Sequence, residues 1–243
     1  MGKFNLQIGN SQWRNIVLGV VLIIITTVFI VWIGNILDHV PFIAAFDKVV
    51  YESIQFSPHP AWLNTLVAPF NFNFLPWGGT FIPSFLYFIF AAGLLYVAIF
   101  NRKDIFFAIL AVILAIGVDA ILFKLTNAYV VRDRPFLHLL NTMPENFKAI
   151  WIHWPTYPSG HVRDMALYSI VLSGYAKKLI WPFIIITLWV SYTRVYLGAH
   201  YPTDVLAGLI LGYLVGLGIL MIVKSLQQII KNKKASAKNE KNY

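Results

Sequence analysis

Residues 194–204 read RVYLGAHYPTD and join two apolar segments, 179–196 and 202–223. This stretch places an arginine at the end of one apolar segment, and a histidine and an aspartate four residues apart at the start of the next. Ionisable groups beside a bilayer are costly, so they usually mark a site. Pro202 suits the first position of a helix, which would put Asp204 in the first turn, within reach of His200.

The composition around this stretch indicates an integral membrane protein. Of 243 residues, 58% are hydrophobic and 12% are charged, whereas a soluble domain is only about half apolar. The absence of cysteine excludes disulfides and thiolate chemistry. Much of the net charge of +9 lies in the lysine-rich end at 224–241. A basic end of this kind is typical of a cytoplasmic, lipid-facing flank, so we expect no nucleic-acid partner.

The apolar segments predict an all-α, polytopic membrane protein built as a six-transmembrane-helix bundle, because one span needs roughly 20 apolar residues. The six segments are Asn15–Leu37, Thr80–Phe100, Ile105–Lys124, His161–Ala176, Leu179–Tyr196 and Pro202–Val223. The fourth is the shortest and carries Arg163 and Asp164 at its start.

The basic residues divide the connectors between the two sides of the membrane. The basic residues on one side are Lys3, Arg14, Arg102, Lys103, Lys177, Lys178 and those of the tail after the sixth segment. The positive-inside rule makes this side cytoplasmic, so both termini would be cytoplasmic in what we expect to be a bacterial inner (plasma) membrane. We expect one integral membrane domain over 1–230 and a basic, disordered cytoplasmic tail over 231–243.

The other connectors, 38–79, 125–159 and 197–201, would then face outward. The first is rich in aromatic residues, and Phe42 and Phe46 have helical spacing. Short amphipathic helices lying in the membrane interface fit this pattern. A packed loop that caps the bundle fits it equally well.

Two further polar stretches lie on the outer side, Lys124–Pro135 (KLTNAYVVRDRP) and Pro158–His161 (PSGH). In the second, Ser159 would cap a helix and Gly160 would allow close approach of a ligand to a helix N-terminus that favours anions. A turn with an ordinary capping serine is the alternative. In the first, the basic residues would either bind an anion or extend toward lipid headgroups.

The residue types in the three stretches suggest a phosphate site. A guanidinium such as that of Arg194 can hold phosphate oxygens in bidentate fashion. A carboxylate on one imidazole nitrogen, as from Asp204 to His200, fixes the tautomer and leaves the other nitrogen free to attack. His161 could supply a proton to the leaving oxygen. An interfacial arginine with an unrelated histidine and a helix-capping aspartate is the alternative for the 194–204 stretch.

In combination, these stretches resemble the type 2 phosphatidic-acid phosphatase family, also called lipid phosphate phosphatases. The family signature is Lys-x6-Arg-Pro, then Pro-Ser-Gly-His, then Ser-Arg-x5-His-x3-Asp. The second motif is intact here, and the third is intact except that Thr193 replaces the serine. In the first motif, Lys124 lies nine residues before Arg134, and Asn127 occupies the position of the family lysine. This shift would place Lys124 about one helical turn deeper.

The resemblance implies a metal-independent hydrolase with no cofactor, acting through a phosphohistidine. It assigns catalysis to His200, His161 and Asp204, and phosphate binding to Lys124, Arg134, Ser159, Gly160 and Arg194. Arg132 is a candidate for part of the lysine's role. Arg163 would contact a phosphate or headgroup, or pair with Asp164, and we favour the pair. Asp119 could pair with Lys124. His138 and His153 have no ligand-type spacing, so we expect surface residues there and no metal site.

The expected function is a membrane phosphatase that acts on a lipid phosphate or diphosphate at the outer face. Candidate substrates are undecaprenyl diphosphate, phosphatidylglycerol phosphate, phosphatidic acid and lipid A phosphate, with membrane lipids as the surroundings. A phosphotransferase that uses the same histidine would carry identical motifs. A transporter or channel with basic gates is a third hypothesis, and it leaves the paired histidines unexplained.

Overall fold

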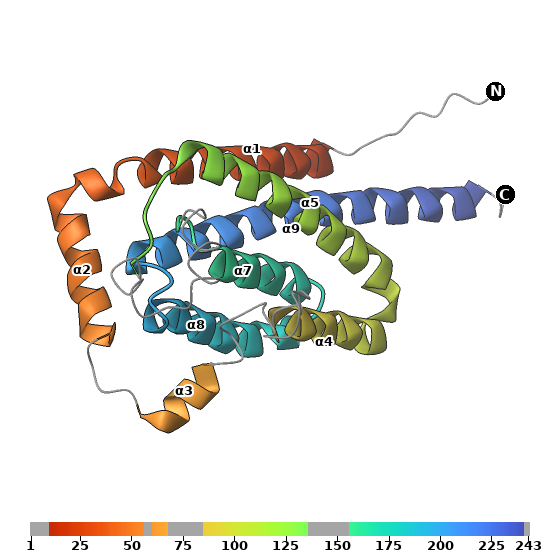
Figure 1. Cartoon of the computed structure of the whole chain (residues 1–243). Helices are drawn as coiled ribbons and strands as arrows, with labels where there is room; N and C mark the ends of the chain where they lie inside the picture. The colour runs from red at the N-terminus through yellow and green to blue at the C-terminus, as the bar shows by residue number, and fades with distance from the viewer. Residues whose placement is uncertain (1–9, 56–59, 68–84, 136–155, 241–243) are drawn as a thin grey trace, which may run out of the picture.

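The computed structural model describes residues 10–55, 60–67, 85–135 and 156–240, and the regular elements among them are all helical (Figure 1). The α-helices are α1 (Asn10–Gly34), α2 (Pro41–Gln55), α3 (Ala61–Val67), α4 (Phe85–Phe100), α5 (Ile105–Tyr129), α7 (Gly160–Ser173), α8 (Ile180–Tyr196) and α9 (Pro202–Glu240). Short 3-10 turns at Leu37–His39, Arg102–Asp104 and Lys177–Leu179 link some of them. The predicted all-α class is confirmed.

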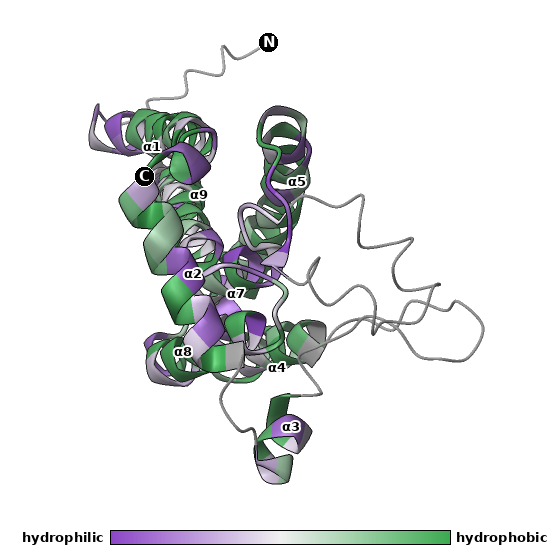
Figure 2. Ribbon diagram, turned by 60° about the vertical axis from the view of Figure 1, so that its left-hand side comes forward, coloured by the Kyte–Doolittle hydropathy of each residue, from purple (hydrophilic) through white to green (hydrophobic). Residues whose placement is uncertain are grey.

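Among the described residues, four helical stretches are long and apolar enough to cross a membrane: Asn10–His39, Arg102–Tyr129, Lys177–Tyr196 and Pro202–Asn239. Many large apolar side chains on these stretches are exposed, as expected for contact with lipid. Figure 2 shows this apolar character in the largely green ribbons of α1 and α5. The chain is therefore an integral membrane protein. α4 and α7 occupy the second and fourth predicted segments with 16 and 14 residues, so the six-span count stays a prediction.

α7 lies in the middle of the bundle and packs closely against α9 (Figure 1). Gly208, Gly212 and Gly216 recur every four residues along α9 and form the contact. A Cβ atom at Gly212 would lie 2.2 Å from the carbonyl oxygen of Arg163. Small residues at this spacing let two membrane helices approach backbone to backbone. The close contact fixes the start of α7 against the start of α9.

The two ends of the bundle differ. α1 begins and α9 ends at one end, whereas α2 lies across the other (Figure 1). α2 buries Asp47 and Tyr51 toward the bundle and leaves Phe42, Phe46 and Val49 exposed. The expected short helices of the first connector are thus present as α2 and α3. Their location in a membrane interface stays a prediction.

The C-terminal tail differs from the expectation of disorder. Residues 231–240 continue α9 as an exposed helix. Alanine, lysine and glutamate are good helix formers, so the basic segment extends the preceding helix without a packed face. Residues 241–243, like His138 and His153, lie outside the described residues.

Candidate active site

The turn after α8 brings His200 back beside Arg194. Gly198 has a φ of 68°, in the left-handed region that glycine adopts without steric cost. The backbone N–H groups of Ala199 and His200 then donate to the carbonyl oxygen of Arg194, at 3.0 and 3.3 Å. The His200 and Arg194 side chains are both buried, at 4% and 1% exposure. The turn therefore places an imidazole next to a buried guanidinium.

The Pro158–His161 motif is held between α1 and α9. The backbone N–H of Ser159 donates to the carbonyl oxygen of Asp204 at 3.0 Å, and the hydroxyl of Tyr157 donates to Ile30 at 2.9 Å. Ser159 occupies the predicted N-cap position, but its side chain makes no capping bond. Its buried Oγ has no hydrogen-bond partner among the described residues. The position where Gly160 would carry a Cβ is open space. The motif thus offers an unused hydroxyl and a helix N-terminus to an anion.

Four side chains from three segments gather at this point. The charges of Arg134 and Arg194 act on both His161 and His200, and His200 also acts on His161. Arg134 also repels Arg194. Arg134 is buried and donates from Nη1 to the carbonyl oxygen of Ala199 at 3.1 Å. Two buried guanidiniums beside two imidazoles form a site whose charge an anion would balance.

Burial lowers the pKa of His200 from its usual 6.5 to about 4, and nearby Arg134 and Arg194 act in the same direction against the opposing effect of Asp204. The imidazole is therefore neutral at pH 7, the form in which a nitrogen can attack.

We expect the His200 signal in histidine-labelled NMR spectra to titrate near pH 4. Because the folded pKa lies below the unfolded value, the linked stability is complete above pH 6.5 and is lost as the pH falls through about 4. The signal is assigned by its loss in His200→Ala. A midpoint near 6.5 in the folded protein would contradict this assignment.

Asp204 does not bond directly to His200, contrary to the expectation from their spacing. Asp204 Oδ2 lies 3.8 Å from His200 Nδ1. The hydroxyl of Thr156 lies between them, 3.0 Å from Nδ1 and 2.7 Å from Oδ2. Sequence reasoning missed Thr156 because a threonine two residues before Pro158 carries no signal of its own. Its role depends on contacts with residues over forty positions away.

Arg132 is bound by three carboxylates, and the phosphate contact considered from the sequence stays a prediction. Its Nε donates to Asp38 at 2.9 Å, its Nη2 to Asp47 at 2.6 Å, and its Nη1 to Asp204. Burial opposes the charge of Arg132, but these carboxylates outweigh it and raise the arginine's pKa. Asp47 also accepts the backbone N–H of Thr203 at 2.9 Å. The buried Asp47 was missed because its partners come from distant segments.

Arg163 pairs with two carboxylates. Its Nε donates to Asp119 at 2.5 Å, and its Nη2 donates to Asp119 at 3.0 Å and to Asp164 at 3.3 Å. The favoured interpretation of Arg163 as an ion-pair residue agrees with this geometry. The partner of Asp119 is therefore Arg163 rather than Lys124. The network joins α5 to α7 two to three residues after His161.

Lys124 lies on the side of α5 opposite its buried face. It is exposed, whereas Leu122 and Thr126, each two residues away and so about 200° around the helix, are buried. Its charge is not among the largest electrostatic influences on His161 or His200.

We therefore expect Lys124→Ala to change kcat/KM for phosphate release by less than about threefold, because an exposed side chain on that side of α5 makes no contact that would be lost in the transition state. Arg134→Ala, measured in parallel, provides the reference for loss of a cation within the site. A loss in Lys124→Ala as large as that in Arg134→Ala would show that the shifted lysine contacts phosphate.

Two buried arginines and two histidines lie together at one end of a membrane bundle. This arrangement is typical of an integral membrane protein that binds an anion. The PAP2 superfamily profile matches residues 105–228, which include these four side chains. The chain belongs to the PAP2 superfamily.

Relatives with established names match part of the chain. An undecaprenyl-diphosphatase of Sulfolobus acidocaldarius is 32% identical over 126 residues, covering 47% of this chain and 57% of the relative. Phosphatidylglycerophosphatase B of Bacillus subtilis is 31% identical over 136 residues, covering 50% and 59%. The matches span little more than half the length of these relatives.

The crystal structure of a transmembrane PAP2-type phosphatidylglycerolphosphate phosphatase from Bacillus subtilis has a similar fold. The TM-score is 0.54 at 20% identity, over 88% of this chain and 96% of that one. At this identity, the likeness shows the shared fold alone.

Proposed function

We propose that this protein is a membrane phosphatase that hydrolyses a lipid phosphate or diphosphate through a phosphohistidine on His200. The observation that carries the proposal is the buried pair Arg134 and Arg194 beside two imidazoles, with the unpaired hydroxyl of Ser159 in the adjoining motif. A phosphoryl group would balance both cations and supply an acceptor for that hydroxyl. The relatives named above act on undecaprenyl diphosphate and phosphatidylglycerophosphate, and these are the first substrates to test.

In the proposed reaction, Nε2 of His200 attacks phosphorus while the bond to the leaving oxygen breaks. His161 gives a proton to that oxygen, which leaves as an alcohol or, from a diphosphate, as a phosphate monoester. The same imidazole then takes a proton from water as the water attacks the phosphohistidine and releases phosphate. Arg134, Arg194 and the N–H of Gly160 would stabilise the three non-bridging oxygens in both steps. No metal or cofactor takes part in this scheme.

The proposed topology has six spans with both termini in the cytoplasm and the site at the outer face of a bacterial plasma membrane. It rests on the basic connectors and on the placement of the site at the end of the bundle opposite the start of α1 and the end of α9 (Figure 1). A site at that level would let a lipid present its headgroup while its chain stays in the membrane.

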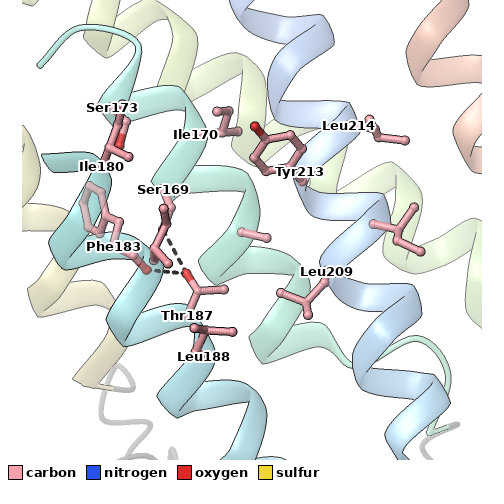
Figure 3. A pocket seen from close by; sticks show the side chains of 13 residues that line it. Ser169, Ile170, Ser173, Ile180, Phe183, Thr187, Leu188, Leu209, Tyr213 and Leu214 are labelled. Atoms are coloured by element: carbon pink, nitrogen blue, oxygen red, sulfur yellow. Dashed lines mark hydrogen bonds between the residues drawn. The ribbon is translucent and has the colours of Figure 1, made fainter. Parts of the chain in front are cut away.

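An apolar groove of about 510 Å³ between α7, α8 and α9 supports a lipid substrate (Figure 3). The groove residues nearest the candidate site are Ala166, Leu188 and Leu209. Along their helices they lie five or six positions from His161, Arg194 and Asp204, respectively. At 1.5 Å per residue, each is about 7–9 Å along its helix from the site. The groove therefore begins at a similar distance from the site along α7, α8 and α9, the three helices that carry the site residues.

The hydroxyls in the groove do not change its apolar character. Thr187 donates to the carbonyl oxygen of Phe183 at 2.6 Å, and its hydroxyl lies 3.4 Å from that of Ser169 (Figure 3). The groove volume falls within the range of about 300–1,000 Å³ typical of ligand pockets. We propose that it holds the hydrocarbon chain of the substrate.

Filling the groove should penalise long chains selectively. Ile184→Trp is expected to reduce kcat/KM at least about tenfold for a dioleoyl lipid phosphate, because displacing two or three buried methylenes costs about 2 kcal/mol. A dioctanoyl substrate should lose much less. Ile185→Trp is the matched control, since Ile185 is on the same helix but is 66% exposed and does not line the groove. Equal losses for both chain lengths would contradict the assignment.

Phosphate release by the purified protein tests the proposed function. The protein in detergent is given undecaprenyl diphosphate, phosphatidylglycerol phosphate, phosphatidic acid and a lipid A phosphate, with and without EDTA. We expect release from at least one of them, unchanged by EDTA. Addition of an acceptor alcohol or sugar distinguishes a phosphotransferase, which would form a phosphorylated acceptor in place of free phosphate. No turnover of any of the four would reject the function.

A further inference from the structure

The Thr156 hydroxyl occupies the space between the proposed nucleophile and the nearest carboxylate. Its Oγ1 is 3.0 Å from His200 Nδ1 and 2.7 Å from Asp204 Oδ2, whereas those two atoms are 3.8 Å apart. All three side chains are buried. The separation of 3.8 Å is too long for a hydrogen bond, so the threonine hydroxyl is the hydrogen-bonded link between the carboxylate and the imidazole.

A hydroxyl has one proton, and its surroundings decide where that proton points. If it pointed to His200, or to the carbonyl oxygen of Ala199 at 3.3 Å, the hydroxyl oxygen and Asp204 Oδ2 would face each other at 2.7 Å with no proton between them. Donation to the carboxylate avoids this repulsion and forms the stronger, charge-assisted bond. The oxygen of Thr156 is then an acceptor, so Nδ1 of His200 must carry a proton to donate to it.

Thr156 and its carboxylate partner Asp204 are both held in place. Asp204 Oδ2 also accepts the backbone N–H of Tyr201 at 2.8 Å, and Oδ1 accepts from Arg132. The backbone N–H of Thr156 donates to the carbonyl oxygen of Arg132 at 3.2 Å. The carboxylate therefore has fixed donors of its own and does not need to turn toward the imidazole.

We propose that Thr156 is a positioning residue that holds His200 as the Nδ1–H tautomer, with Nε2 free to attack, and couples the charge of Asp204 to the imidazole. The proposal rests on the proposed function for its effect on turnover. When Nε2 bonds to phosphorus, the ring becomes a cation that keeps its Nδ1 proton. The fixed Thr156–Asp204 pair stabilises that cation without a proton transfer to the carboxylate.

The kinetic test compares three variants in phosphate release. Thr156→Val keeps the shape and removes the hydroxyl, and it should lower kcat by roughly 10- to 100-fold, the effect of losing a buried hydrogen bond to charged partners. KM should change by less than about twofold, because no contact to the anion is lost. Thr156→Ser should restore most of the rate. Thr126→Val removes a buried hydroxyl that bonds only to carbonyl oxygens of its own helix α5 among the described residues, and it should match the wild type.

The second test reads the tautomer without turnover. In the wild type, ¹⁵N-histidine NMR should show the His200 proton on Nδ1, whereas Thr156→Val should show a mixture of tautomers or a shift to Nε2–H. A wild-type proton on Nε2, or a valine variant with unchanged kcat, would overturn the proposal. If no lipid phosphate is hydrolysed, the proposed function fails, while the tautomer measurement still decides the role of Thr156.

Discussion

Replacement of His200 by alanine is expected to abolish phosphate release, with a loss of at least about a thousandfold, because removal of a covalent nucleophile leaves only binding and electrostatic stabilisation. The fold should be retained, since the ring lies in a turn whose backbone bonds to Arg194 do not involve the side chain. The measurements are phosphate release at saturating substrate and trapping of a phosphorylated intermediate, which should be present in the wild type and absent in the variant.

The matched control is His39→Ala, which removes an exposed histidine of the 3-10 turn Leu37–His39. Its turnover should stay close to that of the wild type. If His200→Ala kept more than about a tenth of the wild-type rate, another group would have to attack phosphorus. If the variant lost activity but the wild type showed no phosphorylated intermediate after rapid quenching, direct attack by water would replace the covalent route.

Replacement of Arg132 by methionine is expected to destabilise the protein strongly. The variant would leave Asp47 and Asp204 as buried carboxylates without their shared counter-ion, which costs about 3–5 kcal/mol. For a chain of this size, the loss corresponds to a fall of about 10 °C in Tm. Thermal unfolding in detergent, with a matching fall in the yield of folded protein, measures the effect.

Arg134→Met is the paired variant, because it removes a buried arginine two residues away with a different role. Burial lowers the pKa of Arg134 to about 10, which shows that its charge is disfavoured where it lies. Its removal should therefore leave Tm nearly unchanged while phosphate release falls by a hundredfold or more, about 2.7 kcal/mol. An Arg132→Met protein with wild-type Tm and selective loss of turnover would instead place Arg132 on the substrate.

The contrast between these arginines shows what the sequence could not determine. Arg132 and Arg134 are both basic residues just after an apolar segment, and the family motif singles out Arg134 by its following proline but leaves the role of Arg132 open. The difference arises because Asp47, from α2, and Asp204, from α9, reach Arg132. Lys124 is similar, because the motif spacing showed the shift but not the exposed side of α5 on which it lies.

The sequence by itself determined the helical membrane class and the start of α7 at Gly160 and of α9 at Pro202, and it predicted the four side chains of the candidate anion site. These follow from hydropathy, helix-capping residues and motif spacing, which act over a few neighbouring positions. Only the tertiary structure decided that Thr156 lies between His200 and Asp204, and that Asp47 shares Arg132. Such contacts join side chains that are distant along the chain, and they depend on how closely the helices pack.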